Sequence, residues 1–240
     1  MAKVPDEYRV QAVNTARETE NKVHDDAIAA RYGFHGGLVP GTNVYGYMAV
    51  PVLERLGRAW LESGRMAVKL LQPFYEGETV VVRVKPDGEN VGEQLAITAE
   101  DESGAIRASG AAGLGAPPPG DLPPEALLPP NRPEASAQVI YSGRVLGTHA
   151  AVLEEPTPES LLSLANSLIV SNYRISPWIH TASEVAFYGT AQPREPLSVR
   201  GIIRDCYQRK GHEFMVVDVV ILGRSLIQRI RHTAIWKLRE

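Results

Sequence analysis

Residues 41–60, GTNVYGYMAVPVLERLGRAW, decide how the first half of the chain folds. Their apolar positions recur at the spacing of an amphipathic helix, so the stretch predicts a long helix that begins near Gly41. Thr42 or Asn43 can cap the free N–H groups at its start, and Pro51 predicts a bend within it. The apolar face comprises Val44, Tyr47, Met48, Val52, Leu53, Leu56 and Trp60.

The segments on either side of this helix predict an antiparallel sheet. Before it, residues 8–15 alternate like a strand, and residues 24–32 form a short helix stopped by Gly33. After it come four β-like runs, separated by turn residues, which is the pattern of a meander. These runs are residues 66–74, 79–84, 94–99 and 105–112.

The second part of the chain repeats this order. A strand is expected at residues 138–142, a helix begins near Thr157, and four strands begin near Thr181, Leu197, Glu213 and Ser225. Residues 70–84 and 185–202 also echo each other, with an aromatic pair, a turn and a β-branched strand. A helix wrapped by a curved antiparallel sheet is expected in each part of the chain, and this predicts an α+β double hotdog.

A proline-rich segment separates the two parts. Residues 114–137, LGAPPPGDLPPEALLPPNRPEASA, contain prolines so often that neither a helix nor a central strand can run through them. We therefore expect an N-terminal hotdog over residues 1–115, a linker over 116–136 and a C-terminal hotdog over 137–240.

Composition excludes several classes of function. The formal charge of -3 over 240 residues gives no basic field for nucleic acid, and no run is long enough to span a membrane. Cys206 is the only cysteine, so no intrachain disulfide can form and a cytoplasmic location is expected. The six histidines lack metal-ligand spacing, and we expect neither a metal nor another cofactor.

The segment between the first strand and the long helix carries the most specific motif. Residues 21–41, NKVHDDAIAARYGFHGGLVPG, resemble the hydratase motif of MaoC-like (R)-specific enoyl-CoA hydratases. Matching positions in order are Asn21, His24, Asp26, Gly33, Phe34 and Gly41. The spacing from the histidine to Gly-Phe is one residue shorter than in that family. The family's catalytic aspartate, five residues before the histidine, falls on Thr19.

The resemblance implies a hydratase or dehydratase acting on 2-enoyl or 3-hydroxyacyl thioesters of CoA or a carrier protein. His24 would activate water, Asn21 would orient it, and Glu20 is the conditional substitute for the missing aspartate. The N–H groups at the start of the long helix would bind the thioester oxygen. The expected substrate-binding residues are Gly41, Thr42, Asn43, Asp26 and His180.

Two other functions stay open. A hotdog thioesterase would need a carboxylate on or near a long helix, and Glu54 and Glu62 lie late on the first one. A non-catalytic hotdog protein that binds an acyl group or a partner would explain Thr19. A homodimer is possible under every alternative.

Overall fold

The computed structural model describes residues 7–87 and 94–239, and within them ten strands form one antiparallel sheet. The strand order is β1-β3-β4-β5-β2-β7-β10-β9-β8-β6. The N-terminal strands are β1 (Glu7–Gln11), β2 (Gly64–Leu70), β3 (Thr79–Pro86), β4 (Gln94–Glu100) and β5 (Ile106–Leu114). The C-terminal strands are β6 (Val145–Val152), β7 (Ile179–Phe187), β8 (Pro196–Arg209), β9 (His212–Leu222) and β10 (Leu226–Lys237).

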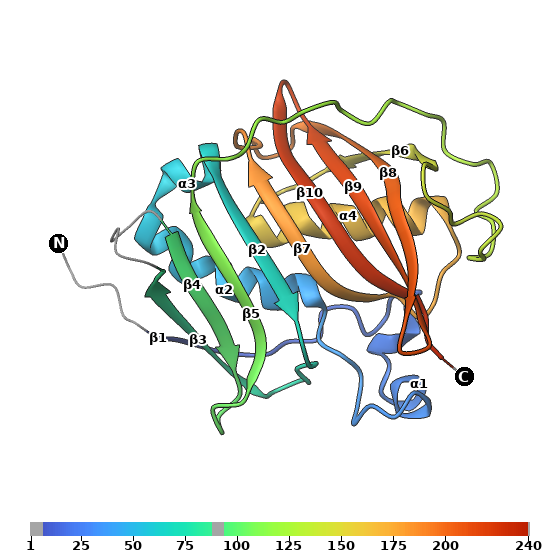
Figure 1. Cartoon of the computed structure of the whole chain (residues 1–240). Coiled ribbons are helices and arrows are strands. Elements are labelled where there is room, and N and C mark those ends of the chain that lie inside the picture. Colours follow the sequence, from blue (N-terminus) through green and yellow to red (C-terminus); the bar gives the residue numbers. More distant parts are fainter. Residues whose placement is uncertain (1–6, 88–93, 240) are drawn as a thin grey trace.

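Two long helices lie against one side of this sheet, each within the curve of its own half (Figure 1). They are α2 (Gly41–Leu56) and α4 (Pro158–Asn172), and Thr157 caps α4 through the N–H of Ser160. The short helices are η1 (Lys22–His24), α1 (Asp26–Arg31) and α3 (Arg58–Ser63).

The two halves have the same internal strand order, read in opposite directions across the sheet. Each half runs from an edge strand, β1 or β6, through three meander strands to the strand that follows its helices, β2 or β7. Because β2 pairs with β7, the halves share one sheet. This arrangement confirms the predicted double hotdog.

The core is continuous across the joint between the halves. Trp60 of α3 and Phe187 of β7 are almost completely buried, and their ring centroids lie 4.8 Å apart. Aromatic side chains of this size are among the largest contributors of buried apolar area. The joint is therefore stabilised by packing as well as by strand pairing.

Several local predictions were wrong, among them the strand expected over residues 8–15, which ends at Gln11. The long helix ends at Leu56 rather than reaching Trp60, because Gly57 has a φ of +68° that helical residues do not adopt. The strand expected at residues 138–142 is a turn, in which the N–H groups of Val139 and Ile140 donate to the carbonyl of Ser136. The edge strand begins at Val145, and a register shift between Leu146 and His149 hides its alternation.

The proline-rich segment forms neither helix nor strand and crosses one side of the sheet from β5 to β6 (Figure 1). Several of its backbone groups bond to the C-terminal half. Tyr188 donates its hydroxyl to the carbonyl of Pro117, and Arg174 exchanges backbone hydrogen bonds with Pro133 and Ala135. The division into two domains stays a prediction.

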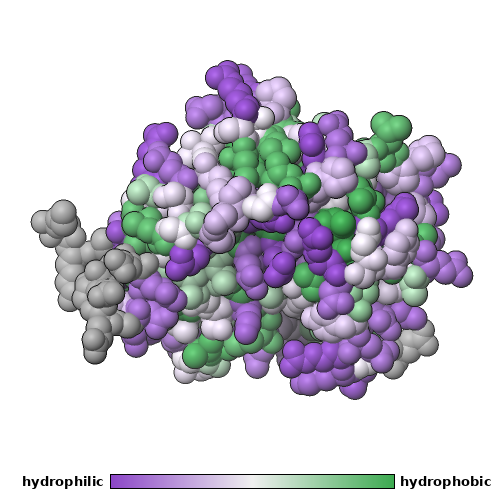
Figure 2. Space-filling view, turned by 45° about the horizontal axis from the view of Figure 1, so that its top comes forward, coloured by the Kyte–Doolittle hydropathy of each residue, from purple (hydrophilic) through white to green (hydrophobic). Residues whose placement is uncertain are grey.

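Hydrophobic residues on the surface form separate groups between hydrophilic ones, as Figure 2 shows for one face. In the part of the chain that the structure describes, no helix is long and apolar enough to cross a membrane.

Candidate functional site

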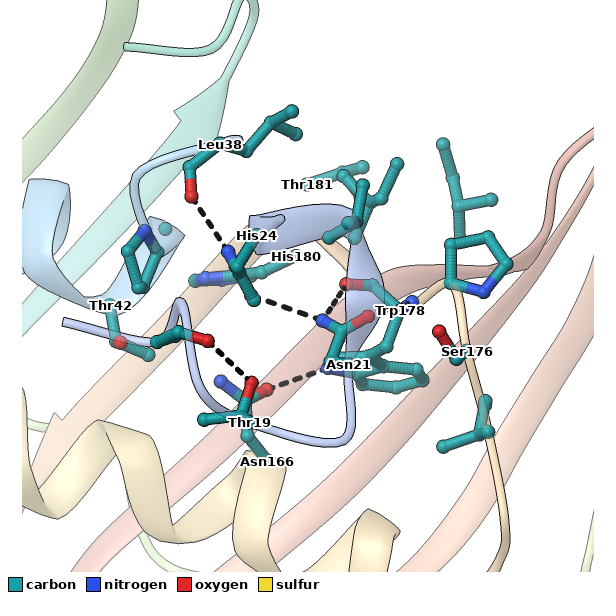
Figure 3. A pocket seen from close by; sticks show the side chains of 18 of the residues that line it. Thr19, Asn21, His24, Leu38, Thr42, Asn166, Ser176, Trp178, His180 and Thr181 are labelled. Carbon is teal, nitrogen blue, oxygen red and sulfur yellow. Dashed lines mark hydrogen bonds between the residues drawn. The ribbon is translucent and has the colours of Figure 1, made fainter. Parts of the chain in front are cut away.

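A cavity of about 1530 Å³ is lined by residues of both halves. The N-terminal half contributes the segment between β1 and α2 and the first residues of α2. The C-terminal half contributes one side of α4, the beginning of β7 and the end of β10. His24 lies in the middle of the close-up in Figure 3, between Leu38 on one side and Asn166 of α4 on the other.

Two hydrogen bonds fix the ring of His24. Its Nδ1 lies 2.7 Å from the carbonyl oxygen of Leu38, and its Nε2 lies 3.1 Å from Nδ2 of Asn21. A carbonyl only accepts, so Nδ1 carries the proton and Nε2 has the lone pair. Burial lowers the pKa of His24, and the Leu38 carbonyl opposes this effect.

The backbone of Trp178 fixes the amide of Asn21 in turn. The N–H of Trp178 donates to Oδ1 of Asn21 over 2.9 Å, and Nδ2 of Asn21 donates to the carbonyl of Trp178 over 2.7 Å. These partners leave only one orientation of the amide, with an N–H directed at Nε2 of His24. A residue of the C-terminal half therefore orients the predicted site of the N-terminal half.

No carboxylate occupies the position five residues before His24, where the hydratase motif has its aspartate. Thr19 lines the cavity and donates its hydroxyl to the carbonyl of Ala16. The Glu20 side chain is 70% exposed, and its carboxylate accepts two hydrogen bonds from Arg132, the shorter of 2.8 Å. The structure thus pairs the proposed substitute base with an arginine of the linker.

Asp26 does not line the cavity. Its Oδ1 accepts the N–H of Gly37 over 2.7 Å, and its other oxygen lies 3.8 Å from Arg17. Gly37 is required here because a Cβ at this position would collide with the carbonyl of His24. Asp26 therefore holds the loop that carries His24, and the structure gives no support for its expected role in substrate binding.

The first residues of α2 do line the cavity. The N–H groups of Gly41 and Thr42 begin the helix and have no partner within it. The amide of Asn43 is occupied, since it donates to the carbonyl of Val13 and to the hydroxyl of Thr15, both over 3.0 Å. Asn43 therefore anchors the segment after β1 to the helix.

His180 lines the cavity but is 8% exposed, and it packs beside Gly41. A Cβ on Gly41 would lie 2.7 Å from Nδ1 of His180 and would also collide with Leu70. The structure thus explains the glycine at position 41 by the packing of His180 and Leu70 against it, whereas the sequence suggested that a glycine lets a thioester come close. Burial lowers the pKa of His180 to about 4.

Sequence reasoning missed Asn166, Glu159 and Trp178. Asn166 accepts a 2.8 Å hydrogen bond from the indole N–H of Trp178, and Glu159 lies in the first turn of α4. Burial raises the pKa of Glu159. The polar residues of α4 that line the cavity recur every three or four positions, a signal that was available in the sequence. They include Glu159, Ser160, Ser163, Asn166 and Ser167.

No family model and no curated protein matches the chain. Solved structures do match it. A protein from Chloroflexus aurantiacus assigned as a MaoC-domain dehydratase superposes with a TM-score of 0.64 at 10% identity, covering 97% of this chain and 94% of its own. A Mycobacterium tuberculosis protein with a double hotdog fold gives 0.60 at 13%, covering 95% and 93%.

Thioesterases share the architecture too. A protein from Thermobifida fusca assigned as a thioesterase II superposes with a TM-score of 0.57 at 13% identity, covering 96% of this chain and 92% of its own. At such identities the likeness concerns the fold alone. The chain is a double hotdog protein with the architecture of MaoC-domain dehydratases, an architecture that thioesterases also have.

Proposed function

We propose that the cavity binds a 2-enoyl or 3-hydroxyacyl thioester, carried by CoA or a carrier protein, and that His24 is the acid–base group of its hydration or dehydration. The observation that supports this most is the chain from the Leu38 carbonyl through His24 to Asn21, inside a cavity of suitable size. It leaves His24 neutral, with a basic nitrogen directed at a single weak partner.

The proposed reaction needs no further reactant besides water. A water molecule replaces the Asn21 N–H as the partner of Nε2 of His24, and Nε2 removes a proton as the water oxygen bonds to C3. The proton on Nε2 then moves to C2, so the enoyl thioester and water become a 3-hydroxyacyl thioester. Negative charge on the thioester oxygen is stabilised by the N–H groups of Gly41 and Thr42.

Two features of the site oppose fast hydration. Residue 19 is a threonine and not a carboxylate, and the carboxylate of Glu20 is paired with Arg132. Without a carboxylate to share the proton transfers, His24 has to serve both as base and as acid. We expect slow turnover because one positioned acid–base group commonly contributes about 100- to 10,000-fold to a rate. A chain with no turnover but retained affinity for thioesters would be a binding protein.

A thioesterase is the second candidate, and Glu159 favours it. This carboxylate lies at the start of α4, lines the cavity, and is held by burial at a raised pKa suited to accepting a proton from water. Glu159 meets the requirement for a helix carboxylate better than Glu54 or Glu62, which are not among the residues that line the cavity.

One assay separates these functions. Crotonyl-CoA and longer trans-2-enoyl-CoAs are incubated with the protein while the ultraviolet absorbance of the enoyl thioester and the release of free thiol are both followed. Hydration removes the absorbance without thiol release, whereas hydrolysis releases CoA. His24→Ala should abolish hydration, with His35→Ala as the matched control because His35 lies outside the cavity lining.

For hydrolysis the decisive variant is Glu159→Gln, with Glu154→Gln as its control, since Glu154 is exposed and pairs with Arg194. Hydration that survives His24→Ala contradicts the proposed role of His24. Binding of the thioesters without either reaction favours the non-catalytic function.

A further inference from the structure

A β-bulge in β7 places two polar side chains on the inner face of the sheet. Along β10, Thr233 pairs with Ala182 and the next residue, Ala234, pairs with His180, so Thr181 is an extra residue in β7. Strict alternation would turn His180 and Ser183 to opposite faces. The bulge brings both inward, and the Thr181 hydroxyl donates to the carbonyl of Thr233 over 3.1 Å.

His180, Ser183 and His232 form a buried hydrogen-bonded chain. Nε2 of His180 lies 2.8 Å from the Ser183 hydroxyl, which lies 3.0 Å from Nδ1 of His232. The three residues are 8%, 1% and 0% exposed, and the two rings stack with centroids 4.3 Å apart. The ring of Trp178 also stacks on that of His232, with centroids 5.8 Å apart.

Each end of this chain has a buried nitrogen without a partner among the described residues, Nδ1 of His180 and Nε2 of His232. Such groups lose their hydration on folding and are rare in native cores unless they serve a purpose. Nδ1 of His180 lies close to the first residue of α2, 2.7 Å from the position that a Cβ on Gly41 would take.

The start of α2 determines how the protons are arranged. A helix N-terminus carries partial positive charge and N–H donors, so it favours a lone pair on Nδ1 of His180 over a proton. Nε2 of His180 then donates to Ser183, whose single hydroxyl proton goes to Nδ1 of His232. The remaining proton of His232 lies on Nε2.

We propose that the His180–Ser183–His232 chain is a positioning element that keeps an imidazole lone pair against the start of α2 and so holds the N–H groups of Gly41 and Thr42 in place for the carbonyl oxygen of a thioester. This rests on the proposed function. Ser183 itself is no nucleophile, because it is 1% exposed and does not line the cavity.

The first test reads the protons directly. Long-range ¹H–¹⁵N spectra of the histidine side chains should identify His180 and His232 as Nε2–H tautomers and His24 as the Nδ1–H tautomer. In Ser183→Ala the signals of His180 should change. An Nδ1–H tautomer of His180 in the unmodified chain overturns the inference without any variant.

The second test follows the backbone amides of Gly41 and Thr42 during titration with two acyl-CoA analogues. One is a ketone in which a methylene replaces the sulfur, and the other is a thioether in which a methylene replaces the carbonyl. We expect both amide signals to move with the ketone only. Ser183→Ala should abolish this response, whereas Ser183→Thr, which keeps the hydroxyl, should restore it.

Ser171→Ala is the matched control, since Ser171 also bonds a histidine, His149, at 2.8 Å but neither residue lines the cavity. If the chain hydrates enoyl thioesters, Ser183→Ala should lower kcat roughly 10- to 100-fold with little change in KM, because small misplacement of reacting groups has effects of that size. Ser171→Ala should leave both constants unchanged.

The outcomes distinguish the two proposals. If neither analogue binds, the proposed function and this inference both fail. If both bind and the amides of Gly41 and Thr42 do not respond, or respond equally in Ser183→Ala, the inference alone fails.

Discussion

The two halves of the molecule share a strand order but differ in what joins the edge strand to the long helix. In the N-terminal half, residues 12–40 intervene between β1 and α2, and they contain η1, α1 and His24. In the C-terminal half, residues 153–157 are enough to join β6 to α4. The fold therefore does not need the longer segment, which supports a role for that segment in the site.

The C-terminal half has longer meander strands and supplies residues that hold the site of the N-terminal half in place. Its meander strands β8, β9 and β10 have 14, 11 and 12 residues, against 8, 7 and 9 in β3, β4 and β5. It also supplies Trp178, which fixes Asn21, and His180, which packs on α2. One half carries the candidate acid–base group, and the other holds it in position.

The largest expected effect comes from placing a carboxylate at position 19, where the hydratase motif has an aspartate. Thr19→Asp should raise the rate of enoyl-thioester hydration by roughly 100- to 10,000-fold, because position 19 lines the same cavity as His24 and would then carry a base. Thr19→Asn has the same size without the charge and should give no increase. Steady-state kinetics on crotonyl-CoA measure this. Equal rates for the two variants would mean that position 19 does not correspond to the catalytic aspartate of the hydratase motif.

The joint between the halves can be broken at Trp60. Trp60→Ala should lower the free energy of unfolding by about 3–5 kcal/mol, since it empties a fully buried site shared with Phe187. Urea unfolding followed by circular dichroism measures the loss. We expect a single transition before and after the change, and two separated transitions would mean that the halves unfold independently.

Acid should act mainly through the C-terminal half. Burial lowers the pKa of His180 to about 4 and also lowers that of His232, so both are neutral when folded at a pH where the unfolded chain binds protons. The contribution of these two histidines to the free energy of unfolding is therefore complete above pH ~6.5. It should fall by roughly 1.4 kcal/mol per pH unit for each histidine below that value, down to about pH 4 for His180.

Urea unfolding between pH 7.5 and 5 tests this dependence. His232→Gln should make it shallower, while the exposed His35→Gln should leave it as it is. Parallel curves for all three proteins would show that the buried pair does not control acid sensitivity. His24, whose pKa is also lowered by burial, contributes in the same direction from the N-terminal half.

The smallest effect is expected where the linker meets the N-terminal segment. Glu20→Gln should change the free energy of unfolding by less than about 1 kcal/mol, because its pairing with Arg132 is at the surface. It should also leave hydration within about twofold, since both carboxylate oxygens of Glu20 are already occupied by Arg132. A large loss of activity with intact folding would instead assign Glu20 to the reaction.

The sequence predicted the fold well because its signals are local and repeated. The helix periodicity at Val44–Leu56 and the alternation of buried residues in β4 survive in the structure, and the prolines at 117–119 exclude regular structure. The edge strand β6 was missed because a bulge and Gly147 interrupt its pattern. Edge strands make fewer contacts and therefore carry weaker sequence signals.

The site was only partly predictable. His24, Asn21 and the start of α2 lie together because they are close in the sequence, and the motif identified them. The contact of Trp178 with Asn21 comes from the other half, and no spacing within one segment reveals it. The bulge at Thr181 was equally hidden, because strand alternation gives the wrong face for Ser183.

The pairing of β2 with β7 inside a single chain has a genetic consequence. When two identical chains form such a joint, every substitution appears on both sides of the symmetry axis. Here a substitution appears once, so a change that improves one half is not repeated at the equivalent place in the other. The equivalent positions were free to diverge, which leaves one candidate cavity with His24 per chain and predicts a stoichiometry of one ligand for each polypeptide.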